Sequence, residues 1–76
     1  MERLLKLLTE VNDGVDFANE TKLVDDGLID SFDIIQIISS IDDEYDISIP
    51  ATEILPENFN SAKTLLALIE KLENED

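Results

Sequence analysis

Ser31 is the residue whose side chain and position could do chemistry, because it stands where a polar loop meets the start of an expected helix. The first backbone N–H groups of a helix have no partner within it, and the helix dipole makes that end positive. A phosphate ester on the Ser31 hydroxyl is therefore favourably placed. A serine needs a base to act as a nucleophile, and the chain contains no His. If Ser31 is modified, another protein must carry out the reaction.

The same serine also has a purely structural interpretation. Serine is a preferred N-cap residue, and Asp30 beside it complements the positive end of the helix dipole. The local pattern therefore leaves two roles open for Ser31, a helix cap or an attachment point for a phosphate-linked group.

Length and charge narrow the class of protein. The chain has 76 residues, which is enough for one small domain with a thin core. Its 19 acidic and 5 basic residues give a formal net charge of −14, which repels nucleic-acid backbones and anionic membranes. We expect partners with basic patches, bound in a salt-dependent way. The alternative is that the acidity serves only solubility.

Residue types that are missing exclude several other functions. Without Cys or His, the chain cannot form disulfides, use a thiolate of its own or build the usual zinc sites. No apolar run is long enough to span a bilayer, and the first residues do not resemble a secretion signal. These observations predict a cytoplasmic protein that does not insert into membranes.

The acidic residues near the two glycines suggest a calcium loop, but their spacing is wrong. If Gly27 were the sixth residue of an EF-hand loop, Lys22, Val24 and Asp33 would occupy its first, third and twelfth positions. The loop around Gly14 fails in the same way, because Thr9 would be its first residue. We therefore do not expect a calcium sensor.

Apolar residues at helical spacing predict two helices in the first half of the chain. One runs from Glu2 to about Asn12, and the second runs from Ser31 to about Tyr45. The apolar stripe of the second helix consists of Ile34, Ile37, Ile38, Ile41 and Tyr45. The loop over residues 13–30, with a short turn near residues 21–24, is long enough to suggest a function.

The second helix also carries a polar ridge opposite its apolar stripe. The ridge consists of Asp33, Gln36, Ser40 and Asp43, and Phe32 lies near its edge. Toward the C-terminus, residues 46–50 are expected to be extended and residues 51–55 to form one helical turn that stops before Pro56. Ser61 is the expected N-cap of a last helix that ends near Glu73. The pattern predicts an all-α protein, a bundle of three main helices and one short helix.

The stretch from Asp25 to Asp33 (DDGLIDSFD) resembles the signature of acyl carrier proteins, in which an Asp-Ser-hydrophobic motif receives 4′-phosphopantetheine. The likeness continues through the Ile-rich helix, the Ile-Ser-Ile-Pro segment ending at Pro50 and the Leu-rich helix after Ser61. It covers about residues 22–73. The agreement of motif, helix pattern, length and acidity makes the resemblance specific.

The resemblance implies a single carrier domain over residues 1–76, folded as a small acyl-carrier-like four-helix bundle. Ser31 would take the phosphopantetheine arm from coenzyme A, transferred by a magnesium-dependent phosphopantetheinyl transferase. The thiol of the arm would hold an acyl or aminoacyl group as a thioester, so that a chain without Cys takes part in thioester chemistry. The resemblance thus implies a monomeric carrier that is not an enzyme. Its partners would be the transferase, a loading ligase, and synthases or transferases.

The resemblance also implies a docking surface for partners with basic patches. The expected docking residues are Asp30, Phe32, Asp33, Gln36, Asp42 and Asp43. Phe32 and Gln36 depart from the residues common in fatty-acid carriers, and the connection over residues 51–61 is longer than in those proteins. The spacing from Gly27 to Ser31 is also longer, and these two longer segments are more like those of discrete D-alanyl or peptidyl carriers. The alternative function is that of an unmodified acidic helical adaptor, in which Ser31 is only a cap.

Overall fold

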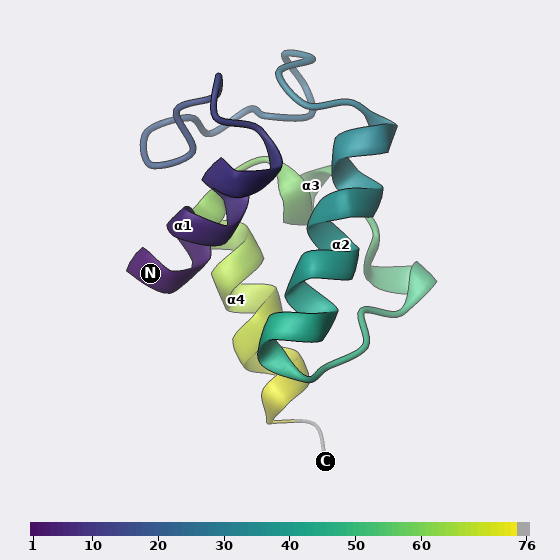
Figure 1. Cartoon of the computed structure of the whole chain (residues 1–76). Coiled ribbons are helices and arrows are strands. Elements are labelled where there is room, and N and C mark those ends of the chain that lie inside the picture. Colours follow the sequence, from purple (N-terminus) through teal and green to yellow (C-terminus); the bar gives the residue numbers. More distant parts are fainter. Residues whose placement is uncertain (75–76) are drawn as a thin grey trace.

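The computed structural model describes residues 1–74, and this part of the chain forms a bundle of helices (Figure 1). The elements are α1 (Glu2–Val11), α2 (Ser31–Tyr45), the 3₁₀ turn η1 (Ala51–Glu53), α3 (Pro56–Phe59) and α4 (Ala62–Glu73). Three long helices and one short α-helix confirm the predicted all-α class. None of the helices within residues 1–74 is long and apolar enough to cross a bilayer.

The core is built from the apolar stripes that the sequence predicts. Leu4 and Leu8 of α1, Ile37 and Ile41 of α2 and Leu65 of α4 are fully buried. Leu7 lies in the same cluster, and so do Phe17, Leu23, Ile29, Ile49, Phe59, Ala62, Leu68 and Ile69. Because these side chains come from every helix and from the long loop, the hydrophobic effect holds the loop and the helices together.

The loop between α1 and α2 runs across one end of the bundle (Figure 1). Phe17, Leu23 and Ile29 anchor it, because all three are at most 3% exposed. The expected turn near residues 21–24 lies slightly later, with the N–H of Asp26 bonded to the oxygen of Lys22 at 2.8 Å. The buried anchors explain how a long loop can hold a defined position.

The segment after α2 differs from the prediction at its second helical element. The expected turn is present at Ala51–Glu53 and ends before Pro56. A second short helix, α3, then begins at Pro56 itself. Proline lacks an N–H that a helix start leaves unpaired anyway, and its fixed φ suits the first helical position. The expectation of a turn that ends before Pro56 is therefore confirmed, whereas the short α-helix that begins at Pro56 was not predicted.

Candidate functional site

The chain reverses direction just before Ser31, and backbone hydrogen bonds fix this reversal. The carbonyl oxygen of Leu23 accepts from the N–H groups of Leu28 at 2.9 Å and Ile29 at 3.1 Å. Gly27 has a φ of +70°, a left-handed conformation that suits glycine. Ile29 is 3% exposed, so its side chain ties the residue next to Asp30 into the core.

Asp30, and not Ser31, is the N-cap of α2. The Asp30 Oδ1 atom accepts from the N–H of Asp33 at 2.9 Å, and Asp33 Oδ2 accepts from the N–H of Asp30 at 3.3 Å. This reciprocal pair is a capping box, which satisfies two donors at the helix start. The alternative interpretation of Ser31 as the helix cap is therefore wrong.

Ser31 is the first residue of α2, and its side chain is exposed. Its hydroxyl makes no hydrogen bond to any of residues 1–74. The backbone N–H groups of Ser31 and Phe32 likewise have no acceptor in this part of the chain, as expected for a helix start. An exposed hydroxyl beside open N–H donors and the positive end of a helix dipole fits a phosphate ester.

Exposed apolar side chains lie close to Ser31 in the sequence. Phe32 is 70% exposed and Ile35 is 65% exposed, and three residues apart they share one face of α2. Leu28, in the loop before the helix, is 38% exposed. Phe32 is one of the predicted docking residues, whereas Ile35 is not. The signal for Ile35 was its position off the stripe of Ile34, Ile37, Ile38 and Ile41.

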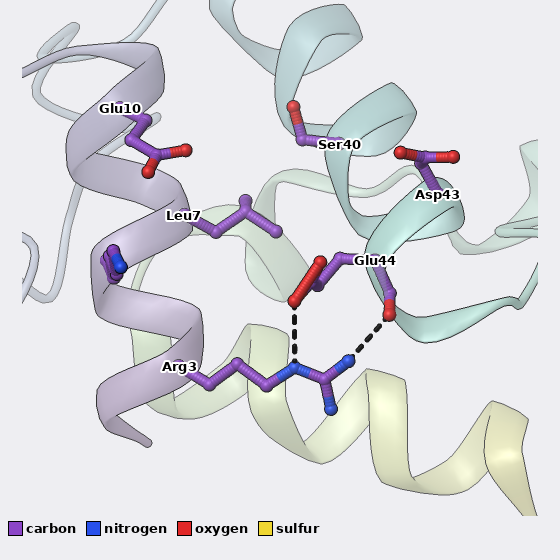
Figure 2. A pocket seen from close by; sticks show the side chains of 7 residues that line it. Arg3, Leu7, Glu10, Ser40, Asp43 and Glu44 are labelled. Carbon is purple, nitrogen blue, oxygen red and sulfur yellow. Dashed lines mark hydrogen bonds and ion pairs between the residues drawn. The ribbon is translucent and has the colours of Figure 1, made fainter.

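The polar ridge of α2 has two different surroundings. Near Ser31, Gln36 is exposed and Asp33 is half-buried in the capping box. At the other end, Ser40 and Asp43 line a cleft between α1 and α2 together with Arg3, Glu10 and Glu44 (Figure 2). Lys6 also lines this cleft. The negative charge of Asp43 thus lies in a cleft that contains basic residues of the same chain.

Arg3 joins the start of α1 to the end of α2 (Figure 2). Its Nε atom donates to Glu44 Oε1 at 3.2 Å, and its Nη2 atom donates to the backbone oxygen of Glu44 at 2.6 Å. The guanidinium carbon lies 4.2 Å from the ring centroid of Tyr45, which is a cation–π contact. Burial raises the pKa of the Tyr45 hydroxyl, with further increases from Glu73 and Glu44, whereas Arg3 lowers it.

Asp42 has a structural contact that the sequence did not indicate. Its Oδ1 atom accepts from the N–H of Ile49 at 3.1 Å, and its backbone oxygen accepts from the N–H of Ile47 at 3.2 Å. Asp42 is half-buried, whereas the neighbouring Asp43 is exposed. These bonds close the turn after α2. The docking role of Asp42 and of the other acidic residues stays a prediction.

The chemistry available at this site is that of an exposed hydroxyl to which a phosphate-linked group can be attached. Within residues 1–74, no group of His, Cys, Asp or Glu is arranged to hold a metal ion. The features that the structure does bring together are the Ser31 hydroxyl, the capped helix start and the apolar side chains of Phe32 and Ile35. This arrangement can present a phosphate-linked group on a fixed helix end.

Sequence comparison with known proteins identifies a family and several relatives of this chain. Residues 2–72 match the protein family described as the phosphopantetheine attachment site. Aminoacyl carrier protein 1 of Bradyrhizobium diazoefficiens is 38% identical over 68 residues, which are 88% of this chain and 74% of that protein. The D-alanyl carrier protein of Lactobacillus acidophilus is 30% identical over 74 residues, covering 95% of this chain and 92% of that protein.

The D-alanyl carrier protein of a Listeria monocytogenes strain is 27% identical over 73 residues, covering 93% of this chain and 94% of that protein. The family match spans almost the whole chain, which the alternative of an unmodified adaptor does not explain. This chain belongs to the acyl carrier protein family, and it is a carrier whose covalent cofactor is 4′-phosphopantetheine.

Proposed function

We propose that Ser31 is the residue to which the phosphopantetheine arm is attached. The observation that carries this proposal is the exposed Ser31 hydroxyl at the first position of α2, which makes no hydrogen bond to residues 1–74. A hydroxyl without an internal partner can enter the active site of a transferase without any loss of protein contacts.

Ser61 provides an internal comparison, because it also stands at the start of a helix. Ser61 is 8% exposed, and its Oγ atom accepts from the N–H of Thr64 at 3.1 Å as the N-cap of α4. Modification there would remove a cap from a buried position. Ser61 is thus the N-cap that the sequence predicts, whereas the exposed hydroxyl of Ser31 supports the proposal that Ser31 is the modified serine.

The chain itself supplies position and not catalysis. When attached, the arm supplies a thiol that can hold an acyl group as a thioester. The chain has no thiol of its own, because it contains no Cys. The residues of the chain hold the attachment point: Asp30 and Asp33 fix the start of α2, and the open N–H groups of Ser31 and Phe32 face the same helix end. Accordingly, we propose that the chain is not an enzyme.

The cargo that we propose is an aminoacyl group. Its support comes from the relatives, since the names of those described above are aminoacyl and D-alanyl carrier proteins. These matches cover most of this chain and most of each relative. A ligase that forms the aminoacyl thioester and a transferase that removes it are the partners that this cargo requires.

Partner docking, as we propose it, uses the end of α2 that carries Ser31. The side chains of Phe32 and Ile35 are largely exposed and offer apolar area, while Asp30, Asp33 and Gln36 add polar groups around them. Exposed charge pairs contribute only about 0–1 kcal/mol each, so they steer partners and allow rapid release. Asp42 and Asp43 lie further along the helix, Asp42 with its carboxylate in an internal hydrogen bond and Asp43 in the cleft with Arg3.

Intact mass spectrometry tests the attachment site. The purified apo chain is incubated with coenzyme A, magnesium and a broad-specificity phosphopantetheinyl transferase, together with Ser31→Ala and the matched control Ser39→Ala. Ser39 is an exposed serine on the same helix. We expect one added phosphopantetheine on the parent and on Ser39→Ala, and none on Ser31→Ala. Addition to folded Ser31→Ala would contradict the proposal.

A second experiment tests the cargo. The carrier is isolated from cells that contain its loading ligase, and the thioester is cleaved with hydroxylamine. Because the chain has no Cys, a hydroxylamine-labile thioester can be only on the arm. We expect release of an amino acid hydroxamate. Release of a fatty acyl hydroxamate alone would contradict the aminoacyl cargo while leaving the attachment site intact.

A further inference from the structure

A single residue far from Ser31 in the sequence holds the loop that leads to it. Asn60 follows α3, and its backbone oxygen accepts from the N–H of Leu23 at 2.9 Å. Its side-chain Oδ1 atom accepts from the N–H groups of Val24 at 3.0 Å and Asp25 at 3.1 Å. Its Nδ2 atom donates to Asp25 Oδ2 at 3.2 Å. Asn60 thus makes four hydrogen bonds to three consecutive loop residues.

Asn60 is itself held in place on both sides. Phe59 before it is 1% exposed, so the residue is anchored to the core. Ser61 after it is the N-cap of α4, in a capping box with Thr64. Side chains that are fixed by packing and by neighbouring hydrogen bonds can define the position of a partner accurately. The Asn60 contact is therefore a fixed point for the loop.

The hydrogen bonds continue from this fixed point to the proposed attachment site. The N–H of Leu23 is bonded to Asn60, and the carbonyl oxygen of the same Leu23 accepts from the N–H groups of Leu28 and Ile29. Ile29 immediately precedes Asp30, the cap of α2, and Ser31 follows. The turn before Ser31 is thus held at both ends. Asn60 binds its beginning, at Leu23, Val24 and Asp25. The carbonyl oxygen of Leu23 binds its end, at Leu28 and Ile29.

We propose that Asn60 is a positioning residue, which holds the loop over residues 23–29 in the conformation that presents Ser31 to the phosphopantetheinyl transferase. This inference rests on the proposed attachment at Ser31. Asn60 acts through Leu23, Val24 and Asp25, and does not take part in the transfer. Without its side chain, the loop is in the competent conformation for a smaller fraction of the time. The apparent affinity for the transferase then falls by that fraction.

The chemistry of the Asn60–Asp25 contact allows a specific test. In Asn60→Asp, the carboxylate can still accept from the N–H groups of Val24 and Asp25, but its second oxygen meets the Asp25 carboxylate with the same charge. In Asp25→Asn, the amide oxygen can still accept from Asn60 Nδ2. In the double variant, Asn at position 25 donates to Asp at position 60. The hydrogen bond is then restored with its direction reversed, and the net charge of the parent is unchanged.

The experiment measures transferase kinetics for the four full-length apo chains at a temperature where circular dichroism shows all of them folded. We expect Asn60→Asp to raise KM about fivefold with little change in kcat. Asp25→Asn and the double variant should stay within about twofold of the parent. If Asn60 only stabilised the fold, Asn60→Asp would lower the unfolding temperature but would not raise KM at an unchanged kcat. A KM for Asn60→Asp within twofold of the parent would overturn the proposal, as would a double variant no better than the single one.

Amide hydrogen exchange provides a readout that does not depend on the transferase. In Asn60→Asp, the amides of Leu28 and Ile29 should exchange about tenfold faster than in the parent, while those of Leu65 and Ile69 in the core of α4 keep their protection. Equal acceleration at all four amides would contradict local positioning. Failure of the Ser31 proposal is distinguishable, because it would appear as modification of Ser31→Ala whatever the result at Asn60.

Discussion

Replacement of Asp30 separates two roles that one carboxylate can have. In Asp30→Ala, the N–H of Asp33 loses the acceptor that lies 2.9 Å away, and the capping box is broken. Loss of an N-cap acceptor costs about 1 kcal/mol, and loss of the charge near the helix dipole adds about 0.3 kcal/mol at an exposed position. In Asp30→Asn, the side-chain oxygen can still accept from Asp33, so most of the first contribution is retained.

The measurement is thermal unfolding followed by circular dichroism. For a domain of this size, 1 kcal/mol corresponds to about 4–8 °C in Tm. We therefore expect Asp30→Ala to lower Tm by about 5–10 °C and Asp30→Asn by less than about 4 °C. An equal loss in the two variants would contradict this assignment, because it would show that the charge and not the cap stabilises α2.

Asp30→Asn also tests whether the charge of Asp30 takes part in docking. Asp30→Asn keeps the helix start in place and removes one negative charge from the proposed docking surface. A higher KM for the transferase with Asp30→Asn, measured at a temperature where the variant is folded, would assign that change to the lost charge. An unchanged KM would remove Asp30 from the docking surface.

Three further predictions concern the acidic residues at the end of α2, the hydroxyl of Tyr45 and the net charge of the chain. Asp42→Ala should lower the free energy of unfolding by about 1 kcal/mol, because the N–H of Ile49 loses its acceptor, while the exposed Asp43→Ala should change it by less than about 0.5 kcal/mol. Denaturant unfolding measures both, and equal effects would contradict the assignment. Tyr45 has a raised pKa because of its burial, so the folded state holds its proton more tightly than the unfolded state. Its contribution to stability is complete below about pH 10 and is lost as the pH rises through the raised pKa, whereas Tyr45→Phe should lack this alkaline loss in pH-dependent unfolding. Binding of the transferase to the parent should weaken with added salt because the carrier has a net charge of −14, and a salt-independent affinity would exclude acidic docking.

Helices α1, α2 and α4 could be predicted from the sequence because each carries an apolar stripe that the core requires. The predicted start of α2 at Ser31 is confirmed, but local preference alone did not select its cap, since Asp30 and Ser31 are both good N-cap residues. Asp33 decides between them, because the reciprocal capping box needs an acceptor side chain three residues after the cap. A capping box at Asp30 is what leaves the Ser31 hydroxyl free of internal contacts.

Two other features depend on contacts that the local sequence does not contain. The turn that ends before Pro56 is as predicted, but the local sequence did not indicate that Pro56 also begins a helix, α3, for which its fixed φ is well suited. Asn60 could not be selected, because its partners Val24 and Asp25 lie 36 and 35 residues away in the sequence. Asp42 is a predicted docking residue, but only the folded chain shows that its carboxylate accepts from the N–H of Ile49.

Thiol labelling followed by peptide mapping tests whether the arm is attached at Ser31. The chain has no Cys and five Ser residues, so the unmodified protein contains no thiol and every label reports an arm. After co-expression with a phosphopantetheinyl transferase, the protein is labelled with a maleimide, digested and sequenced by tandem mass spectrometry. We predict one label per chain, on the peptide that contains Ser31 and at that residue. A label at another serine, or none on folded protein that the transferase has been shown to bind, would contradict the account.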